Sequence, residues 1–279
     1  MTGTPTPKAV AWIDGRWGAP EQLQLPLADR GLQLADGVFE TIWVEGGQPQ
    51  LLQPHLRRWR EGAALLGMAP PPTGTDLEPL LQEAIRRAGG QGALRLNWSR
   101  GNQMARGIDL PPHDPQADGH RLWLQLTPCR ATFTPLTAMV SRQETRNGSS
   151  LLSRCKTFAY GQAIQARREA QRAGAQEALL RSGSGELCCG ATANVLVQRQ
   201  GRWLTPPLSS GCLPGVMRGR LLELGLAEEA RLEASAEPGD RWLLINSLSC
   251  RPLLRLEGQP LGAWPHAEAE AEQLWRRLL

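Results

Sequence analysis

Two periods of apolar residues alternate along the first 110 positions. Apolar residues at every second position predict strands, and apolar residues three and four apart predict amphipathic helices. Asp14-Gly15 is a dipeptide that favours a two-residue hairpin turn, while Pro54 and Gly67 are typical of the beginning and the end of a helix. The elements predicted on this basis are a hairpin over 12–16, strands over 38–44 and from 48 to about 52, helices over 54–66 and about 76–88, and a strand over 92–99.

The rest of the chain continues the mixture of short strands and amphipathic helices. The predicted strands cover 122–126, 138–141, 177–180, 193–198 and 203–204, and the predicted helices cover 161–173 and 215–224. A proline-rich stretch at 111–120 has the composition of a linker. Strands and helices on both sides of it predict an α+β fold of two α/β domains, with an N-terminal domain at 1–110 and a C-terminal domain at 121–279.

Composition places the chain among ordinary globular proteins. It has 279 residues, of which 41% are apolar and 21% charged, and its formal charge of +4 comes from scattered basic residues. This charge pattern argues against a nucleic-acid partner. No apolar run is long enough to predict a membrane span, and residues 1–11 lack an apolar signal core, so we expect a cytoplasmic protein. The six cysteines form no CxxC pair, which predicts buried thiols rather than a zinc site or disulfide framework.

Lysine is almost absent from the chain. Of 31 basic residues only Lys8 and Lys156 are lysine, and the others are arginine. A GC-rich genome accounts for a general preference for arginine codons. Arginine cannot replace lysine where an amine must condense with an aldehyde, because the guanidinium group stays protonated. Lys156 is therefore a candidate for covalent chemistry with a carbonyl group.

Two motifs in the N-terminal half resemble a known family. Residues 29–41 read DRGLQLADGVFET, and residues 55–58 read HLRR. Both are similar to the fold-type IV, or class IV, pyridoxal 5'-phosphate (PLP) enzymes, which include branched-chain and D-amino-acid aminotransferases and aminodeoxychorismate lyases. The resemblance implies the D-amino-acid aminotransferase-like fold, a substrate-facing Thr41 and a phosphate-binding Arg58. A guanidinium group suits that role because it can hold two phosphate oxygens at once.

Two further motifs extend the resemblance into the C-terminal half. Residues 156–160 read KTFAY, and residues 205–218 read TPPLSSGCLPGVMR. The resemblance implies a Schiff base between PLP and the lysine, and a phosphate site at the free amides that begin a helix. The residues that it assigns to the cofactor in this half are Lys156, Tyr160, Asn194, Val216, Met217 and Ser247. Met217 stands where the family usually has threonine, and a core position remains the alternative for Tyr160.

One stretch departs from the family at a position that matters for chemistry. Residues 188–194 read CCGATAN and resemble the family's TEGSSSN, so that Cys189 stands where the family has a glutamate. That glutamate pairs with the pyridine nitrogen of PLP and keeps the ring a strong electron sink. A thiol does this less well, since its reference pKa is about 8.5 against about 4.3 for glutamate. Glu186 is the alternative partner and requires a shift of three residues.

This departure and two loops favour a lyase. A weaker electron sink disfavours the reprotonation of the cofactor that transamination requires, whereas elimination to an aromatic product depends on it less. Residues 245–249 and 99–107 resemble stretches of the aminodeoxychorismate lyases, and Arg100 or Arg106 would bind a substrate carboxylate. The alternative for these arginines is a solvated surface loop.

The resemblance therefore implies a PLP-dependent 4-amino-4-deoxychorismate lyase that releases pyruvate and 4-aminobenzoate in folate biosynthesis. It also implies a homodimer with a small-molecule substrate. Two alternatives remain open: an aminotransferase acting on branched-chain or D-amino acids, and a PLP-binding homologue without turnover.

Overall fold

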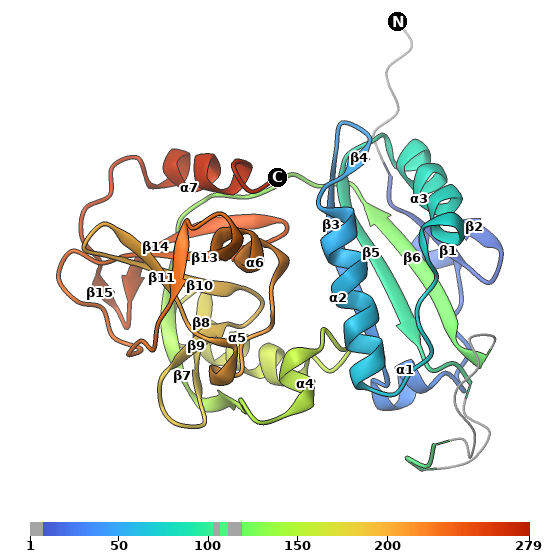
Figure 1. Ribbon diagram of the computed structural model, residues 1–279, viewed down its shortest axis with the longest axis horizontal. Helices are drawn as coiled ribbons and strands as arrows, with labels where there is room; N and C mark the ends of the chain where they lie inside the picture. The colour runs from blue at the N-terminus through green and yellow to red at the C-terminus, as the bar shows by residue number, and fades with distance from the viewer. Residues whose placement is uncertain (1–7, 103–106, 111–118) are drawn as a thin grey trace, which may run out of the picture. The chain divides into compact units, whose positions relative to one another are not determined.

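The computed structural model describes residues 8–102, 107–110 and 119–279, which form two compact units (Figure 1). The first unit comprises Met1–Arg130 together with Cys155–Phe158, and the second comprises Ala131–Arg154 and Ala159–Leu279. The short segment 155–158 joins the first unit by strand-like contacts. Thr157 pairs with Val38, and the Phe39 amide donates to the Lys156 carbonyl at 2.8 Å. The lysine is thus fixed to the first unit by its own backbone.

The first unit is built on an antiparallel sheet of six strands in the order β2-β1-β6-β5-β3-β4. The strands are β1 (Val10–Ile13), β2 (Arg16–Gly18), β3 (Gly37–Glu45), β4 (Gln48–Pro49), β5 (Gly92–Ser99) and β6 (Arg121–Thr127). The helices are α1 (Arg30–Leu34), α2 (Leu52–Leu65) and α3 (Gly74–Ala88). Both α2 and α3 pack on the sheet (Figure 1). Their core includes Val38, Ile42, Trp59, Leu77 and Leu94.

Strand β3 separates two environments within this unit. Its side chains alternate between the faces of the sheet, so that Val38 and Ile42 lie in the core with the helices. Glu40, between them in the alternation, shares that face. Phe39 and Thr41 lie on the opposite face, away from the helical core. The same strand therefore supplies side chains to two separate polar clusters.

The boundary of the first unit lies later than the composition predicted. Strand β6 was assigned to the C-terminal domain, but it pairs with β1 and β5 inside the first sheet. The predicted linker at 111–120 therefore connects two strands of one sheet; its residues 111–118 lie outside the described part of the chain. Proline and glycine mark a turn in the backbone, and they carry no information about which strands pair on either side of it.

The second unit contains a mixed sheet of nine strands. Its order is β12-β11-β10-β13-β14-β7-β8-β9, and β15 pairs with β14. The strands are β7 (Leu136–Arg146), β8 (Glu177–Ser182), β9 (Leu187–Gly190), β10 (Asn194–Arg199), β11 (Arg202–Thr205), β12 (Ala227–Glu229), β13 (Arg241–Asn246), β14 (Ser249–Leu256) and β15 (Gln259–Pro260). The helices are α4 (Leu151–Arg154), α5 (Gly161–Arg172), α6 (Val216–Glu223) and α7 (Ala267–Arg276). The pairs β7–β8, β7–β14 and β11–β12 are parallel.

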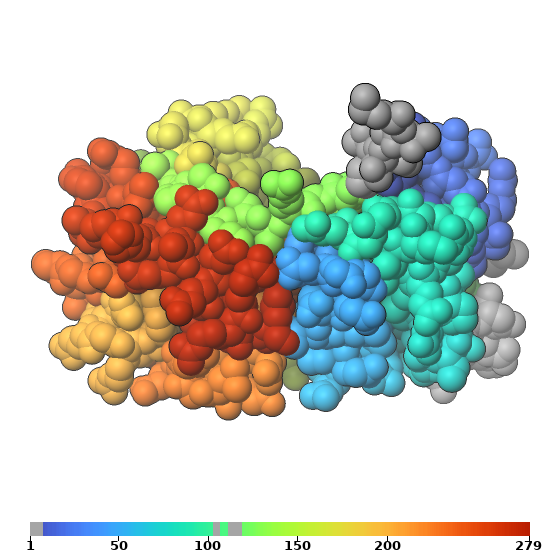
Figure 2. Space-filling model, turned by 90° about the horizontal axis from the view of Figure 1, so that it is seen from above, coloured from blue at the N-terminus to red at the C-terminus, as the bar shows by residue number. Residues whose placement is uncertain are grey.

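Two apolar clusters stabilise the second unit. One contains Leu179, Val195 and Trp242 among other strand residues. The other is rich in small and sulfur-containing side chains and consists of Met139, Ala166, Ala170, Ala178, Leu180, Cys188, Cys189 and Cys212. The C-terminal segment, red in Figure 2, lies on the surface of this unit, and the Trp275 indole of α7 donates to the Asn246 carbonyl at 3.0 Å.

The two-unit α+β architecture confirms the predicted fold class. Of the six cysteines, five are buried as predicted, and Cys129 is exposed. No helix in the described part of the chain is long and apolar enough to cross a membrane.

Candidate active site

Lys156 lies over an aromatic ring on the open face of the first sheet. Its Nζ is 4.4 Å from the centroid of the Phe39 ring. Arg95 of β5 contacts the same ring, with Cζ 3.6 Å from the centroid. Thr41 shares the face of Phe39 and pairs in register with Arg95. The structure thus brings the predicted residues Lys156 and Thr41 together with an arginine that the sequence analysis did not identify.

Arg95 has the properties of a carboxylate-binding side chain. It is half-buried, and its Nε donates to Asn97 Oδ1 at 2.7 Å, which orients the guanidinium group. Planar guanidinium groups bind carboxylates through parallel hydrogen bonds. The sequence did carry a signal for it. In the alternating strand 92–99, Arg95 occupies the face opposite to the buried Leu94 and Leu96.

The other face of β3 holds a buried cluster of charged residues. Glu40 is completely buried, and its carboxylate accepts from Arg58 Nε at 2.8 Å and from Arg58 Nη2 at 2.6 Å. His55 Nδ1 lies 2.7 Å from the same carboxylate. Burial raises the pKa of Glu40, but Arg58 and His55 outweigh it and lower the pKa to about 2. Arg58, predicted to bind phosphate, is therefore held by an ionised carboxylate.

His55 is neutral in this cluster. Burial lowers its pKa, the hydrogen bond to Glu40 opposes this effect, and the positive charges of Arg58 and Lys156 lower the pKa further. A neutral imidazole has one N–H, and the short contact to Glu40 places that N–H on Nδ1. The buried cluster of Glu40, His55 and Arg58 thus carries one negative charge, on Glu40, and one positive charge, on Arg58.

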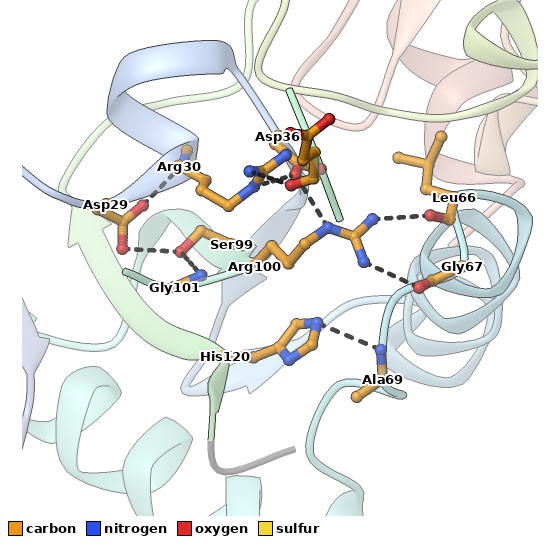
Figure 3. A network of polar contacts seen from close by, with 12 residues as sticks. Asp29, Arg30, Asp36, Leu66, Gly67, Ala69, Ser99, Arg100, Gly101 and His120 are labelled. Carbon is orange, nitrogen blue, oxygen red and sulfur yellow. Dashed lines mark hydrogen bonds and ion pairs between the residues drawn. The ribbon is translucent and has the colours of Figure 1, made fainter. Parts of the chain in front are cut away.

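Arg100, predicted to bind a substrate carboxylate, contacts one side chain and two backbone carbonyls of the first unit. Its Nε donates to Asp36 Oδ2 at 2.9 Å, its Nη1 to the Gly67 carbonyl at 2.9 Å and its Nη2 to the Leu66 carbonyl at 2.8 Å (Figure 3). The residue is only 7% exposed. It therefore satisfies carbonyls at the end of α2, which lack partners within the helix. Arg106, the other candidate, lies outside the described residues.

In the second unit, the beginning of α6 is suited to an anion. The first-turn amides of Val216 and Met217 lie at a helix N-terminus whose N-cap, Gly215, provides no side-chain cap. A Cβ atom on Gly215 would lie 2.0 Å from Asn194 Oδ1, so only glycine fits there. Asn194 Nδ2 donates to the Leu213 carbonyl at 3.0 Å. The predicted residue Asn194 therefore shapes the turn that leads into the helix.

Two other predicted cofactor residues of the second unit occupy turns. Tyr160 precedes α5 as its N-cap residue, and Ser247 lies between β13 and β14. Both are half-buried. The turn at Ser247 is fixed by Asn246, whose Oδ1 accepts from the Leu248 amide at 2.9 Å and from the Ser249 hydroxyl at 3.0 Å.

Cys189 lies in β9 opposite Leu180 and is buried. The interaction of the two adjacent cysteines raises the pKa of Cys188 and lowers the pKa of Cys189, while burial disfavours the thiolate at both. Glu186, the alternative to Cys189, precedes β9 and forms an ion pair with Arg231. Strand β9 thus contains a thiol at position 189, and the nearby carboxylate of Glu186 is paired with Arg231.

These groups fit PLP as the predicted cofactor. The first unit contains an amine and an oriented guanidinium group over one aromatic ring. The second unit, taken by itself, contains a helix N-terminus whose free amides suit an anion. Among the described residues, no group of three or more histidine, cysteine or acidic side chains is arranged to hold a metal ion.

Comparisons with known proteins agree along most of the chain. The family model described as "Amino-transferase class IV" matches residues 37–255. The D-alanine aminotransferase of Bacillus licheniformis is 26% identical over 271 residues, which cover 90% of this chain and 89% of that protein. The bifunctional aminodeoxychorismate lyase / D-amino acid transaminase of Mycobacterium tuberculosis is 26% identical over 288 residues, which cover 94% and 96%. The solved PLP-bound form of a hypothetical aminotransferase from Mycobacterium tuberculosis matches with a TM-score of 0.79 at 22% identity, covering 96% and 98%.

Proposed function

Since this chain belongs to the amino-transferase class IV family and is a PLP-dependent enzyme, we propose that it converts 4-amino-4-deoxychorismate to 4-aminobenzoate and pyruvate. Relatives of this chain are named for different reactions, so membership of the family does not by itself specify the reaction. The bifunctional relative carries both this lyase activity and D-amino-acid transamination in its name. The choice between them rests on the residues of this chain.

Lys156 is the proposed catalytic residue. Its amine would hold PLP, and the same amine, once free of the cofactor, would take the proton from the amine-bearing carbon of the substrate. PLP supplies the electron sink for this step when it is bound. Arg95 and Lys156 contact the same Phe39 ring, so a substrate whose amine reaches the lysine brings a carboxylate within range of the guanidinium group. Thr41, beside Arg95, offers a hydroxyl group on the same face.

The proposed phosphate ligands are Arg58 and the amides of Val216 and Met217. Backbone amides at a helix N-terminus and guanidinium groups both bind phosphate in proteins. The family resemblance adds Tyr160, Asn194 and Ser247 as proposed cofactor contacts. We also propose that the enzyme is a homodimer.

The observation that carries the choice of a lyase is the buried thiol of Cys189. The family places a glutamate at this position, whereas β9 presents a sulfur atom here and Glu186 pairs with Arg231. A thiol stabilises a protonated ring nitrogen less than a carboxylate does. Release of pyruvate yields an aromatic product, whose stability lowers the demand on the electron sink. Transamination has no such compensation.

A second candidate is D-amino-acid transamination. It is favoured by the D-alanine aminotransferase, which matches 90% of this chain. The adjacent Cys188 lowers the pKa of the Cys189 thiol, burial opposes this effect, and the positive charge of Arg146 lowers the pKa further, in the direction that an acidic group at this position requires.

The two candidates differ in their products. We expect the purified enzyme to release pyruvate and 4-aminobenzoate in equal amounts from 4-amino-4-deoxychorismate, measured by a coupled dehydrogenase assay and by fluorescence. Conversion to the pyridoxamine form by an amino acid, with no pyruvate released from aminodeoxychorismate, would overturn the lyase proposal. The Lys156→Ala variant should lose activity by a factor of about 10² to 10⁴ or more, and its PLP should no longer be trapped by borohydride. The Lys8→Ala variant is the matched control, because Lys8 is the other lysine of the chain.

A further inference from the structure

We propose that Glu40 is a positioning residue that fixes Arg58 for the cofactor phosphate. The inference rests on the proposed role of Arg58 and assigns a function to a residue that does not itself touch the cofactor. It arises from the geometry of the buried cluster Glu40–His55–Arg58, in which one carboxylate orients two neighbouring side chains.

The two hydrogen bonds from Arg58 fix the plane of its guanidinium group. Nε donates to Oε1 of Glu40 and Nη2 donates to Oε2, so the contact is a fork in which both oxygens take part. A fork of two parallel bonds removes rotation of the planar group, which a single bond would allow. The directions of the other N–H groups of Arg58 are therefore set by Glu40.

The carboxylate is itself held in place. It is completely buried at the centre of β3, and His55 Nδ1 contacts its Oε2 at 2.7 Å. Its pKa of about 2 keeps it ionised at every pH at which the protein would be assayed. Arg58 is similarly enclosed, with its side chain 10% exposed. Because both side chains are enclosed, water cannot replace a lost hydrogen-bond partner. Loss of Glu40 therefore changes the orientation of Arg58.

The positioning of Arg58 by Glu40 can be distinguished from the direct effect of the Glu40 charge on the phosphate. Glu40 carries a negative charge beside a proposed phosphate ligand, and by Coulomb's law its removal would strengthen phosphate binding. A positioning role predicts the opposite result, because an arginine without its fork loses the direction of its donors. The sign of the change in PLP affinity therefore distinguishes the two roles.

The test compares PLP with pyridoxal, which lacks the phosphate. Dissociation constants for both are measured by equilibrium dialysis of the full-length wild type and the Glu40→Gln variant. We expect the variant to bind PLP about tenfold to a hundredfold more weakly, the range for losing hydrogen bonds to a charged group, and to bind pyridoxal as the wild type does. Unchanged or tighter PLP binding by Glu40→Gln would overturn the inference.

One further variant controls for the general effect of removing a buried carboxylate, and a double variant tests whether Glu40 acts through Arg58. Asp240→Asn removes another buried carboxylate that holds an arginine, Arg199, through a fork, at 3.1 and 2.8 Å, and should leave the PLP-to-pyridoxal ratio unchanged. The double variant Glu40→Gln/Arg58→Met removes both charges together, and it should bind PLP no more weakly than Arg58→Met alone. Additive losses in the double variant would mean that Glu40 acts independently of Arg58, against the inference.

Failure of the inference differs from failure of the phosphate proposal. If the wild type binds PLP and pyridoxal equally, Arg58 has no phosphate role and both ideas are wrong. If the wild type prefers PLP and Arg58→Met abolishes that preference while Glu40→Gln retains it, the phosphate role stands and the positioning role is wrong.

Discussion

The first unit buries a carboxylate beside its proposed cofactor residue, and the second unit buries a thiol. Glu40 remains ionised because Arg58 and His55 more than offset the cost of burial. Cys189 lies in a cluster of sulfur-containing and small apolar side chains, beside the buried thiol of Cys188. The first unit thus retains the charged groups that suit phosphate, whereas the second lacks the carboxylate expected at the ring nitrogen. A buried carboxylate thus stays charged where a guanidinium group and an imidazole contact it, whereas the buried thiol has apolar and sulfur-containing neighbours.

The largest expected effect concerns a buried cation of the first unit. Replacing Arg100 by methionine leaves the carbonyls of Leu66 and Gly67 unsatisfied and removes one partner of Asp36. We expect the free energy of unfolding to fall by about 3 kcal/mol, measured by urea denaturation. The exposed Arg86, paired with Glu83 within one helix, is the matched control, and Arg86→Met should cause little change. A normal stability of Arg100→Met combined with weaker substrate binding would restore the substrate role.

Acid should affect the two units in opposite directions. The pKa of Glu40 is lowered to about 2, so its contribution, about 3 kcal/mol from the shift, is present above its usual pKa and is lost as the pH falls toward 2. Burial raises the pKa of Glu177, against the effect of Arg167, so ionisation of Glu177 disfavours the folded second unit and acid relieves this cost.

Hydrogen exchange measured by mass spectrometry separates these responses. Between pH 5 and pH 3, peptides of α2 should lose protection before peptides of β8, once the rates are corrected for the intrinsic effect of pH. Glu40→Gln should remove the acid dependence of α2, and Glu177→Gln should leave it intact. Simultaneous loss of protection in both elements at every pH would contradict the opposite signs.

A smaller effect is expected from restoring the missing acid in the second unit. In Cys189→Glu, conversion to the pyridoxamine form by a D-amino acid should become faster by about tenfold, which corresponds to about 1.4 kcal/mol. Stopped-flow absorbance measures this half-reaction. Cys212→Ala, a change at a neighbouring thiol of the same cluster, is the control and should behave as the wild type. A Cys189→Glu variant with unchanged half-reaction kinetics would show that residue 189 does not act on the ring nitrogen.

Much of the fold could be predicted because its elements bury one face. The hairpin at Asp14-Gly15 was found, and both residues have the positive φ angles, 47° and 78°, that the dipeptide favours. Helix α7 was not predicted. Its sequence begins AEAEAEQ, an alternation of apolar and polar residues that obscures the helical period, and it buries Ala267, Ala271 and Trp275 at intervals of four.

Local motifs allowed candidate residues to be named, and their roles stay predictions. Lys156 and Thr41 were identified from their motifs, and they lie on the same face of the first sheet. The contacts of Arg100 could not be predicted, because its partners Asp36 and Leu66 are far away in sequence and become neighbours only in the fold. Arg95 and Glu40 were missed for a related reason. Their significance depends on which face of a strand they occupy and on what lies there.

The assignment of four residues, Cys155–Phe158, to the first unit has a consequence for dissecting the gene. The polypeptide passes between the units three times, so no single cut releases both as independent fragments. A product truncated at residue 130 would lack Thr157, which pairs with Val38, and would also lack the amine. A fragment that ends at residue 130 is therefore expected to be less stable than the first unit within the whole chain.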